Sequence, residues 1–507
     1  MKRRRKGSIG SSRATTRRGK RVAVAEKVDD DEPESQQLGV SFADLPTHVI
    51  GHILLRLPIK SIGICKCVCT SWKALISDPH FTKLHLQQAP AGFTIRANDR
   101  SRVSRILHLL EYEPEDFENV EDGQFCRCYS LIKPECNSHL KLEQKLKLPL
   151  RSGAKLDLDE AEKRGRKGHY IPSKPEDDRF FVVNSSNGLL CLSDHLGENF
   201  VVSNPVTGEF IRLPEATRID ATDYIQHRRS YVGFGFEPKT DEYKVVRIFH
   251  LGWGAKEVKS IEIYTLGTST WRNVGGVNAA DFVWLEFPTS VSGVLHWIGY
   301  YQTKLSILCF DFESESFQSF PSPPHLFKYS DKKNITMGEL KGSLYICDSS
   351  SKDNYVRMWI MKKYGFGDSW TNVFSIDTMS IDGWPYGGLY WPVKHLENGA
   401  AVLMYHSSNC FIYYEPENSG LKVFKVRGTY SAFEAIHHIH YSAFGPIHHI
   451  PSLISLKDAV KGDNIEVMNV HSRCGKFKLR EENEVLFLAN VNAVVVNSNF
   501  ISLDDEE

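Results

Sequence analysis

Apolar residues at helical spacing open the folded part of the chain. Between residues 41 and 88 they recur three or four positions apart, starting with Leu45, Val49, Ile50, Ile53, Leu54 and Leu57. Asp44 is placed to cap this first helix and Pro58 to end it. Further short helices are predicted around Ile59–Cys65 and Thr70–Ser77, and from Asp78-Pro79 onward. So small a helical unit cannot bury all its apolar residues by itself, so some should face a partner.

After Pro90 the pattern changes to short runs in which apolar and polar residues alternate. Half-buried antiparallel strands have this alternation. The clearest runs are Phe180–Val183, Tyr243–Phe249, Ile261–Tyr264 and Ile307–Phe310. Residues 111–178 are charged and in places patternless, so we interpret them as an exposed insertion in the β domain.

A repeat of about fifty residues, close to the period of kelch-like propeller blades, underlies the strand region. Apolar strands led by glycine begin at Gly188, Gly233, Gly293, Gly342 and Gly399. Each is followed by a strand, a polar turn and a large residue, with turns within 203–210, 264–271, 311–317 and 414–421. The repeat predicts a closed β-propeller over residues 91–456, with a two-sheet sandwich as the alternative. The number of blades does not follow from it.

The two ends of the chain have a different composition. Residues 1–40 carry basic clusters followed by an acidic run and almost no large apolar side chains, so we expect a disordered tail. The basic clusters resemble a bipartite nuclear import signal, and a merely solvated tail is the alternative. Residues 457–507 form a C-terminal extension to which the sequence assigns no clear role.

Charge and hydropathy exclude several classes of protein. Lysine plus arginine and aspartate plus glutamate both number 62, and this balance argues against direct nucleic-acid binding over the whole surface. The chain has no secretory signal and no apolar run of the roughly 18 residues that a membrane span needs. We therefore expect reduced thiols, no membrane contact, and a location in the nucleus and/or cytoplasm.

Three clusters of potential metal ligands have spacings unlike those of zinc sites. They are Cys65, Cys67 and Cys69; Cys126, Cys128 and Cys136; and the histidines within 437–449, which lie in a near-duplicated segment. Zinc needs four converging ligands, so we expect no metal and no cofactor. No phosphate-binding loop, dinucleotide fingerprint or nucleophile elbow is present, so no enzymatic activity is expected. A propeller enzyme such as a copper oxidase would need a site that this sequence does not offer.

The helical unit resembles an F-box. The resemblance rests on Leu45-Pro46, the Ile50/Ile53/Leu54 stripe, Leu57-Pro58, and the two runs 67–72 and 75–81 (CVCTSW and LISDPHF). The strand region is similar to the F-box-associated domain of a large plant family, in segments that include 204–209 (NPVTGE), 233–246, 293–297, 359–365 and 451–456. The predicted fold class is therefore α+β: a small helical F-box at 41–88, followed by a mainly antiparallel β domain that forms a propeller.

The resemblance implies the substrate-recognition subunit of an SCF-type ubiquitin ligase, with no catalysis of its own. The F-box would bind a Skp-type adaptor and through it a cullin, and the β domain would bind a protein substrate that the sequence does not identify. The implied adaptor-binding residues, about half of them expected in the core, are Leu45, Pro46, Ile50, Ile53, Leu54, Leu57, Pro58, Val68, Cys69, Trp72 and Leu75.

Three positions depart from the family pattern. Gly63, Ile64 and Cys65 stand where the family commonly has a leucine, an arginine and a phenylalanine. A glycine inside a helix costs about 1 kcal/mol relative to alanine, so we expect a weaker second helix or a weaker adaptor contact. An interaction scaffold that has lost adaptor binding is therefore the alternative function.

Overall fold

The computed structural model describes the helical unit and most strands of the β domain. Its residues divide into two compact units, 1–50 and 51–507. No helix in the described part is long and apolar enough to cross a membrane. The described residues are 45–89, 92–96, 106–110, 139–140, 144–149, 180–194, 197–217, 230–251, 258–276, 282–301, 304–324, 334–349, 354–385, 387–395, 401–408, 410–417, 420–426, 446–461 and 465–470.

Four short helices begin the described chain: α1 (Thr47–Leu54), α2 (Ile59–Cys65), α3 (Thr70–Ile76) and α4 (Pro79–Gln88). Pro58 stands at the N-cap of α2, where its missing N–H costs nothing. Asp78 caps α4, because its Oδ1 accepts the backbone N–H groups of His80 at 2.7 Å and Phe81 at 3.3 Å. The helices lie where the sequence predicts them, although α1 is shorter than predicted, and Asp44 lies outside the described residues.

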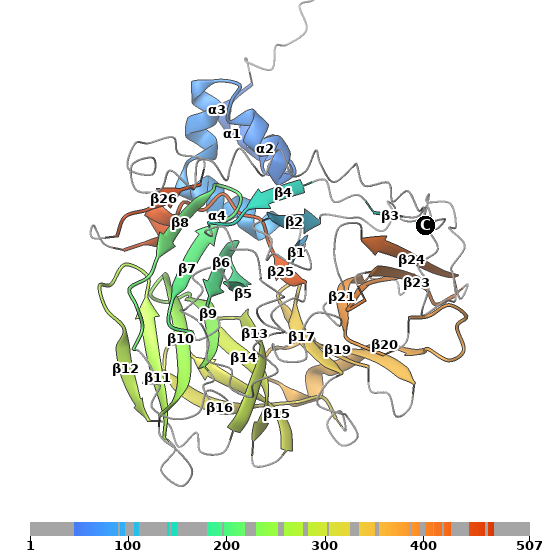
Figure 1. The fold of residues 1–507 in the computed structure, drawn as a ribbon. Helices are drawn as coiled ribbons and strands as arrows, with labels where there is room; N and C mark the ends of the chain where they lie inside the picture. Colours follow the sequence, from blue (N-terminus) through green and yellow to red (C-terminus); the bar gives the residue numbers. More distant parts are fainter. Residues whose placement is uncertain are drawn as a thin grey trace, which may run out of the picture. The chain divides into compact units, whose positions relative to one another are not determined.

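Six separate sheets of mainly antiparallel strands make up the β domain, so it is a six-bladed propeller and not a two-sheet sandwich (Figure 1). The strands of blades 1 to 3 are β1 (Gly92–Arg96), β2 (Ile106–Leu110) and β4 (Gln144–Lys147); β5 (Phe181–Ser186), β6 (Leu189–Ser193), β7 (Phe200–Asn204) and β8 (Glu209–Arg212); and β9 (Ser230–Glu237), β10 (Glu242–Leu251), β11 (Val258–Thr265) and β12 (Arg272–Gly276).

The strands of blades 4 to 6 are β13 (Phe282–Val291), β14 (Val294–Tyr301), β15 (Lys304–Asp311) and β16 (Ser316–Phe320); β17 (Ile335–Leu340), β18 (Ser343–Asp348), β19 (Tyr355–Met361) and β20 (Trp370–Asp377); and β21 (Tyr390–His395), β22 (Val402–His406), β23 (Cys410–Glu415) and β24 (Gly420–Val426). Within each sheet, consecutive strands pair with one another as a simple meander.

Three further strands join blades from far away in the sequence. β25 (Ile447–His449) pairs with β1 and is the innermost strand of blade 1. β26 (Met468–Asn469) pairs with the outer strand β8 of blade 2. β3 (His139–Leu140), which lies in the predicted insertion, runs parallel to the outer strand β24 of blade 6. The ring is thus closed by C-terminal residues that complete the N-terminal blade.

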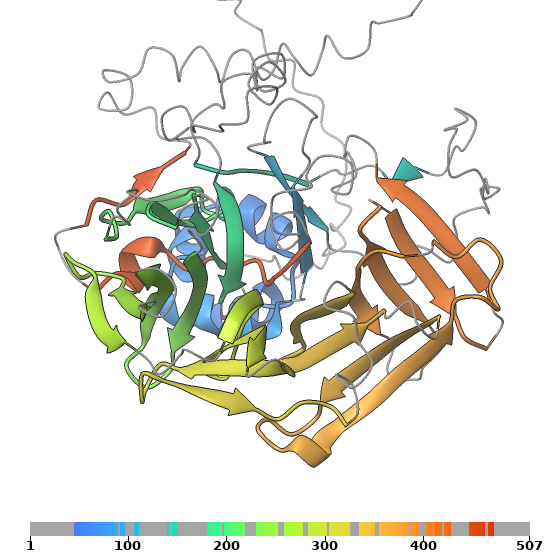
Figure 2. The ribbon, with the colours of Figure 1, turned by 60° about the horizontal axis from the view of Figure 1, so that its bottom comes forward.

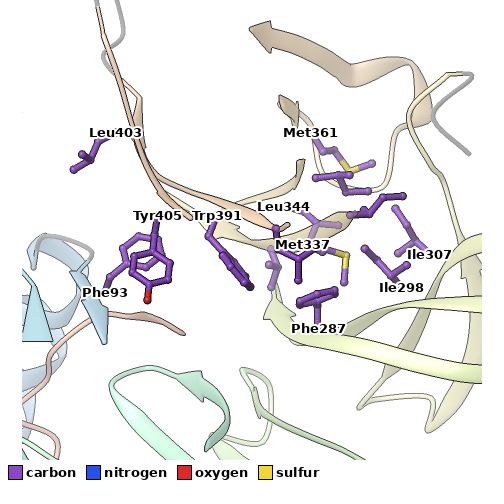
Figure 3. Close-up of a cluster of buried hydrophobic side chains, with 14 of the residues drawn as sticks. Phe93, Phe287, Ile298, Ile307, Met337, Leu344, Met361, Trp391, Leu403 and Tyr405 are labelled. Carbon is purple, nitrogen blue, oxygen red and sulfur yellow. The ribbon is translucent and has the colours of Figure 1, made fainter. Parts of the chain in front are cut away.

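Figure 2 shows the blades side by side, and buried apolar clusters join blades 1 and 2, 2 and 3, 3 and 4, and 5 and 6. The inner strands contact one another in the order β25, β5, β9, β13, β17 and β21. One buried cluster joins Phe93 of β1, Phe287 of β13, Met337 of β17 and Tyr405 of β22 (Figure 3). Burial of such side chains contributes about 25 cal/mol per Å² of apolar surface, so the packing between blades stabilises the ring.

The glycine-led repeat marks the second strand of four blades. Asn187-Gly188, Ser292-Gly293 and Lys341-Gly342 all have positive φ at both residues, as two-residue hairpin turns of type I′ require, and the second strands β6, β14 and β18 follow them. Gly233 does not follow this pattern, because it lies inside β9, the first strand of its blade. Gly399 lies outside the described residues, and β22 follows it.

Candidate functional site

The helical unit carries an exposed apolar surface. Five large apolar side chains of the described residues are exposed, and three of them belong to α1, α2 and the turn that follows α2: Ile53 at 36 %, Ile64 at 63 % and Val68 at 61 %. Large apolar side chains that stay exposed often mark a site where a protein partner binds. This surface is the strongest candidate for a protein-binding site in the helical unit.

The eleven predicted adaptor-binding residues differ in exposure. Pro46, Ile53, Pro58, Val68 and Cys69 are exposed, and Leu45, Leu57, Trp72 and Leu75 are half-buried. Only Ile50 and Leu54 are buried, which is fewer than the predicted half. Nine of the eleven side chains therefore have surface that a partner can contact, and their role in adaptor binding stays a prediction.

The sequence prediction left Ile64 out of the site, although its side chain is the most exposed large apolar one in the described chain. The sequence marks Ile64 as a departure from the family pattern and not as a contact. Its neighbour Gly63 lies inside α2 with open space around the position that a Cβ would occupy. The departure therefore leaves α2 formed and places an isoleucine at the surface.

Replacing Gly63 by alanine is expected to stabilise the protein by roughly 0.5–1 kcal/mol. The methyl group would meet no atom within 4 Å, and alanine restricts the unfolded chain more than glycine does. The measurement is the free energy of unfolding in urea. The control is Gly188→Ala, which should destabilise, because Gly188 has φ +78° and its Cβ would lie 2.3 Å from the Ser452 Oγ. An unchanged or lower stability of Gly63→Ala would contradict the open position.

Cys69 has a structural task at the start of α3. Its Sγ accepts the Trp72 N–H at 3.5 Å and lies 3.1 Å from the Ser71 hydroxyl. The Ser71 hydrogen bond and then the Trp72 N–H lower the pKa of this exposed thiol from its ordinary value. Cys67 donates to the Gly63 carbonyl at 3.8 Å, so two of the three clustered cysteines serve local turns.

His85 links α4 to the turn between α1 and α2. Its Nε2 lies 3.4 Å from the Leu57 carbonyl oxygen, and its side chain is almost fully buried. Desolvation lowers the pKa of His85, and the hydrogen bond to Leu57 opposes that effect only in part. A neutral imidazole at this place ties the turn at Leu57 to α4.

The clusters of potential metal ligands lie partly inside and partly outside the described residues. Nowhere in these ranges do three His, Cys, Asp or Glu side chains converge as metal ligands. Of the clustered histidines, His448 and His449 form part of β25, and His437, His438 and His440 lie outside the described residues, as do Cys126, Cys128 and Cys136. The His449 Nδ1 lies 2.9 Å from the Ser185 hydroxyl of β5, so this histidine joins blades 1 and 2.

The NPVTGE segment of the β domain anchors the C-terminal residues. Asn204 is fully buried, and its Nδ2 donates to the carbonyl oxygens of Ser452 at 3.0 Å and Ile454 at 2.8 Å. The Glu209 carboxylate accepts the Leu456 N–H at 2.8 Å at the start of α8 (Leu456–Ala459). The two motifs that carry the resemblance, 204–209 and 451–456, are thus two halves of one contact.

Family comparison decides the identity of both parts. Residues 42–84 match the F-box domain, and residues 160–448 match the F-box associated beta propeller domain, which covers more than half of the chain. The chain belongs to the F-box proteins with an associated propeller. The first match contains α1, α2 and α3 with Ile53, Ile64 and Val68, so the exposed apolar surface is a surface of the F-box.

Plant F-box proteins are similar over most of this chain. F-box protein At3g07870 of Arabidopsis thaliana is 26% identical over 456 residues, which cover 81% of this F-box protein and 94% of the relative. F-box/kelch-repeat protein At3g23880 of the same plant is 25% identical over 394 residues, 74% of this chain and 91% of the relative.

Among solved structures, a Nidogen/Laminin complex aligns with a TM-score of 0.30 and 8% identity over 66% of this chain and 93% of the other. Saccharomyces cerevisiae Sqt1 aligns with a TM-score of 0.27 and 14% identity over 49% of this chain and 62% of the other.

Proposed function

We propose that this F-box protein is a substrate receptor of an SCF-type ubiquitin ligase. Its F-box binds a Skp-type adaptor and through it a cullin, and its propeller binds the protein that is to be ubiquitinated and degraded. The observation that carries the proposal is the exposed apolar surface of Ile53, Ile64 and Val68 within the matched F-box. The receptor acts by holding its target near a ubiquitin-charged enzyme, which raises the effective concentration of the two and needs no catalytic residue here.

The apolar surface suits an adaptor because each of its side chains gains more by burial than a polar side chain would. Covering a large aliphatic side chain contributes roughly 1.5–3 kcal/mol. Polar side chains of α2 and α3 are exposed as well, among them Lys60 and Ser71. An apolar centre with a polar rim is the usual arrangement of a specific protein interface.

Replacing Ile64 and Val68 together by aspartate is expected to weaken adaptor binding by about 2–4 kcal/mol, which is roughly 30-fold or more. The loss arises because a carboxylate at each position would have to be desolvated against the partner. Binding is measured by isothermal titration of the purified chain with a Skp-type adaptor. Since both side chains are exposed, the stability of the free protein should change by less than about 0.5 kcal/mol.

The matched control is Gln87→Asp on α4, an exposed polar position away from Ile64 and Val68 in the sequence, which should bind the adaptor like the wild type. Equal adaptor affinity of the double variant and the wild type would remove this surface from the interface. A folded wild type that binds no Skp-type adaptor would instead favour the interaction scaffold.

We also place the protein in the nucleus and/or cytoplasm. The basic clusters of residues 1–40 support the nuclear part of this proposal, although they lie outside the described residues. Imaging the full chain as a fluorescent fusion, with and without these clusters, tests it, and an equal distribution of both fusions would remove their role.

A further inference from the structure

The outer edges of the blades differ in how they end. In blades 2 and 6 the outermost strand is covered by an added strand from elsewhere in the chain: β26 lies on β8 and β3 lies on β24. One addition is antiparallel and the other parallel. The outer edges of this propeller therefore accept extra strands in both directions.

Three of the remaining outer strands are short, and two carry charges. β4 has four residues and includes Lys145 and Lys147. β12 has five residues, and its Arg272 forms an ion pair with Glu315 of the β15–β16 turn. β16 also has five residues. Short length and charged side chains are the usual ways in which a protein keeps a sheet edge from pairing with another chain.

β20, the outermost strand of blade 5, is longer than these three strands and carries no charge before its last position (Figure 1). It runs for eight residues, from Trp370 to Asp377, and contains no proline, lysine or arginine. Its only ionisable side chain is Asp377, at the last position. A bulge at Val373 interrupts the pairing with β19, and on either side of it the strand presents an edge that no other described strand covers.

Exposed apolar side chains stand at both ends of this edge. Outside the F-box, the only exposed large apolar side chains in the described ranges are Phe366, which is 56 % exposed, and Met379, which is 62 % exposed. Phe366 precedes β20 by four residues, and Met379 follows it by two. Exposed apolar residues that flank an open backbone edge suit a bound peptide, because the backbone supplies affinity and the side chains supply specificity.

The two ends also differ in charge. At the Phe366 end, Lys362 and Lys363 are exposed with one carboxylate, Asp368, and the Lys363 Nζ lies 4.1 Å from the centre of the Phe366 ring. At the Met379 end, Asp382 is exposed and Asp377 is half-buried. A peptide with an acidic residue at the first end would be complementary to this edge.

We propose that the outer edge of β20 binds an extended segment of a partner protein as an added strand of blade 5. The segment has apolar side chains that contact Phe366 and Met379 and an acidic residue near Lys362 and Lys363. In taking that partner to be the ubiquitination target, the proposal rests on the proposed function. The two added strands on β8 and β24 are its precedents within the same ring.

A displayed library of random peptides of about twelve residues tests the proposal, since an extended peptide of that length spans β20 and its flanks at roughly 3.3 Å per residue. Peptides selected on the full-length chain are measured by fluorescence anisotropy. We expect Asn372→Lys/Ser375→Lys, which alters two exposed side chains of β20, to weaken binding about tenfold or more. Phe366→Ala and Met379→Ala should each weaken it as well.

Methylating the peptide backbone separates strand addition from side-chain docking. The backbone N–H groups of a strand point alternately toward the partner strand and away from it. N-methylation of the residues whose N–H groups point toward β20 should therefore abolish binding, and N-methylation of the residues between them should spare it. The matched control, Gln318→Lys/Ser319→Lys on β16, changes two exposed side chains of another outer strand and should leave the affinity unchanged.

Three results would overturn the proposal: a library that yields no binding peptide, peptides insensitive to the β20 variants, or binding insensitive to backbone methylation. A wild-type dimer in light scattering that the β20 lysine variant dissociates would show that a second copy of this chain is the occupant, which also overturns it. Adaptor binding is measured on the same variants and should not change. If the wild type bound the selected peptides but no Skp-type adaptor, the receptor function would be refuted and peptide binding at β20 would still be supported.

Discussion

Replacing Asn204 by aspartate is expected to destabilise the propeller by about 3 kcal/mol or more at neutral pH, and by less in acid. The Asn204 Nδ2 donates to two backbone carbonyls, of Ser452 and Ile454, and the side chain has no exposed surface. Aspartate cannot donate when it is ionised, so both carbonyls would lose a partner and a charge would be buried beside them. Each unsatisfied buried group costs roughly 1–3 kcal/mol.

The pH dependence identifies the cause. Full burial and the two carbonyl oxygens raise the pKa of the introduced carboxyl above its unfolded value of about 3.9, and the N–H groups of Val206 and Thr207 at the other oxygen oppose only part of this rise. Between that value and the raised pKa the folded state holds a proton that the unfolded state has lost, so stability falls as pH rises through this window. Urea unfolding at several pH values measures the difference from the wild type.

Two matched variants complete the test. Asn204→Ala should lose stability with no added pH dependence, and Asn372→Asp, at an exposed position of β20, should change stability by less than about 0.5 kcal/mol. If Asn204→Asp and Asn204→Ala lost equal stability at every pH, the introduced carboxyl would not be buried against the carbonyls. The role of the NPVTGE segment as an anchor would then be wrong.

Replacing Glu262 by glutamine is expected to cost about 3–5 kcal/mol, because it leaves a buried guanidinium without its closest counter-charge. Arg247 has no exposed side-chain surface, and its Nη1 lies 3.1 Å from the Glu262 Oε2. Burial lowers the pKa of Arg247, while Glu262 and the more distant Glu198 and Asp194 raise it. The Arg247 Nε and Nη2 atoms have no hydrogen-bond partner, so the site has little to replace the lost carboxylate.

The double change Arg247→Met/Glu262→Leu should recover most of the lost stability, since apolar side chains of similar volume need no counter-charge. The free energy of unfolding of both single variants and the double variant gives the coupling. Glu313→Gln, in the exposed ion pair with Lys239, is the control and should cost less than about 1 kcal/mol. A loss at Glu262 no larger than at Glu313 would mean that water reaches the Arg247 guanidinium.

The sequence predicts those helix ends and turns that single residues determine through their own backbone or side chain. Pro58 and Asp78 fix helix ends through their own backbone and side chain, so α2 and α4 begin at the predicted places. Gly188, Gly293 and Gly342 mark turns and place the strands that follow them. Gly233 has the same appearance in the sequence but another cause: a Cβ there would lie 2.3 Å from Leu295 and 2.7 Å from Trp297, so the glycine admits the neighbouring blade.

The sequence does not predict which distant strands pair or which single side chains are exposed. Nothing near β3 or β26 indicates that these two-residue strands extend blades 6 and 2, because their partners lie far away in the chain. The apolar spacing of α1 likewise does not tell Leu54, which is buried, from Ile53, which is exposed. Ile64 was missed for the same reason, since a single apolar residue shows no face until the helix is placed.

The closing strand has a consequence for how the protein is made. Thr94 of β1 and Ile447 of β25 are hydrogen-bonded although 353 residues separate them, so the first blade lacks its inner strand until nearly the whole chain has left the ribosome. Contacts this distant in sequence also form slowly, because a long loop must close first. The F-box helices α2, α3 and α4 contact one another over short sequence distances, so they can form early. The F-box therefore folds while the ring is still open, and a chain that ended before residue 446 would carry a folded F-box on an unfinished propeller.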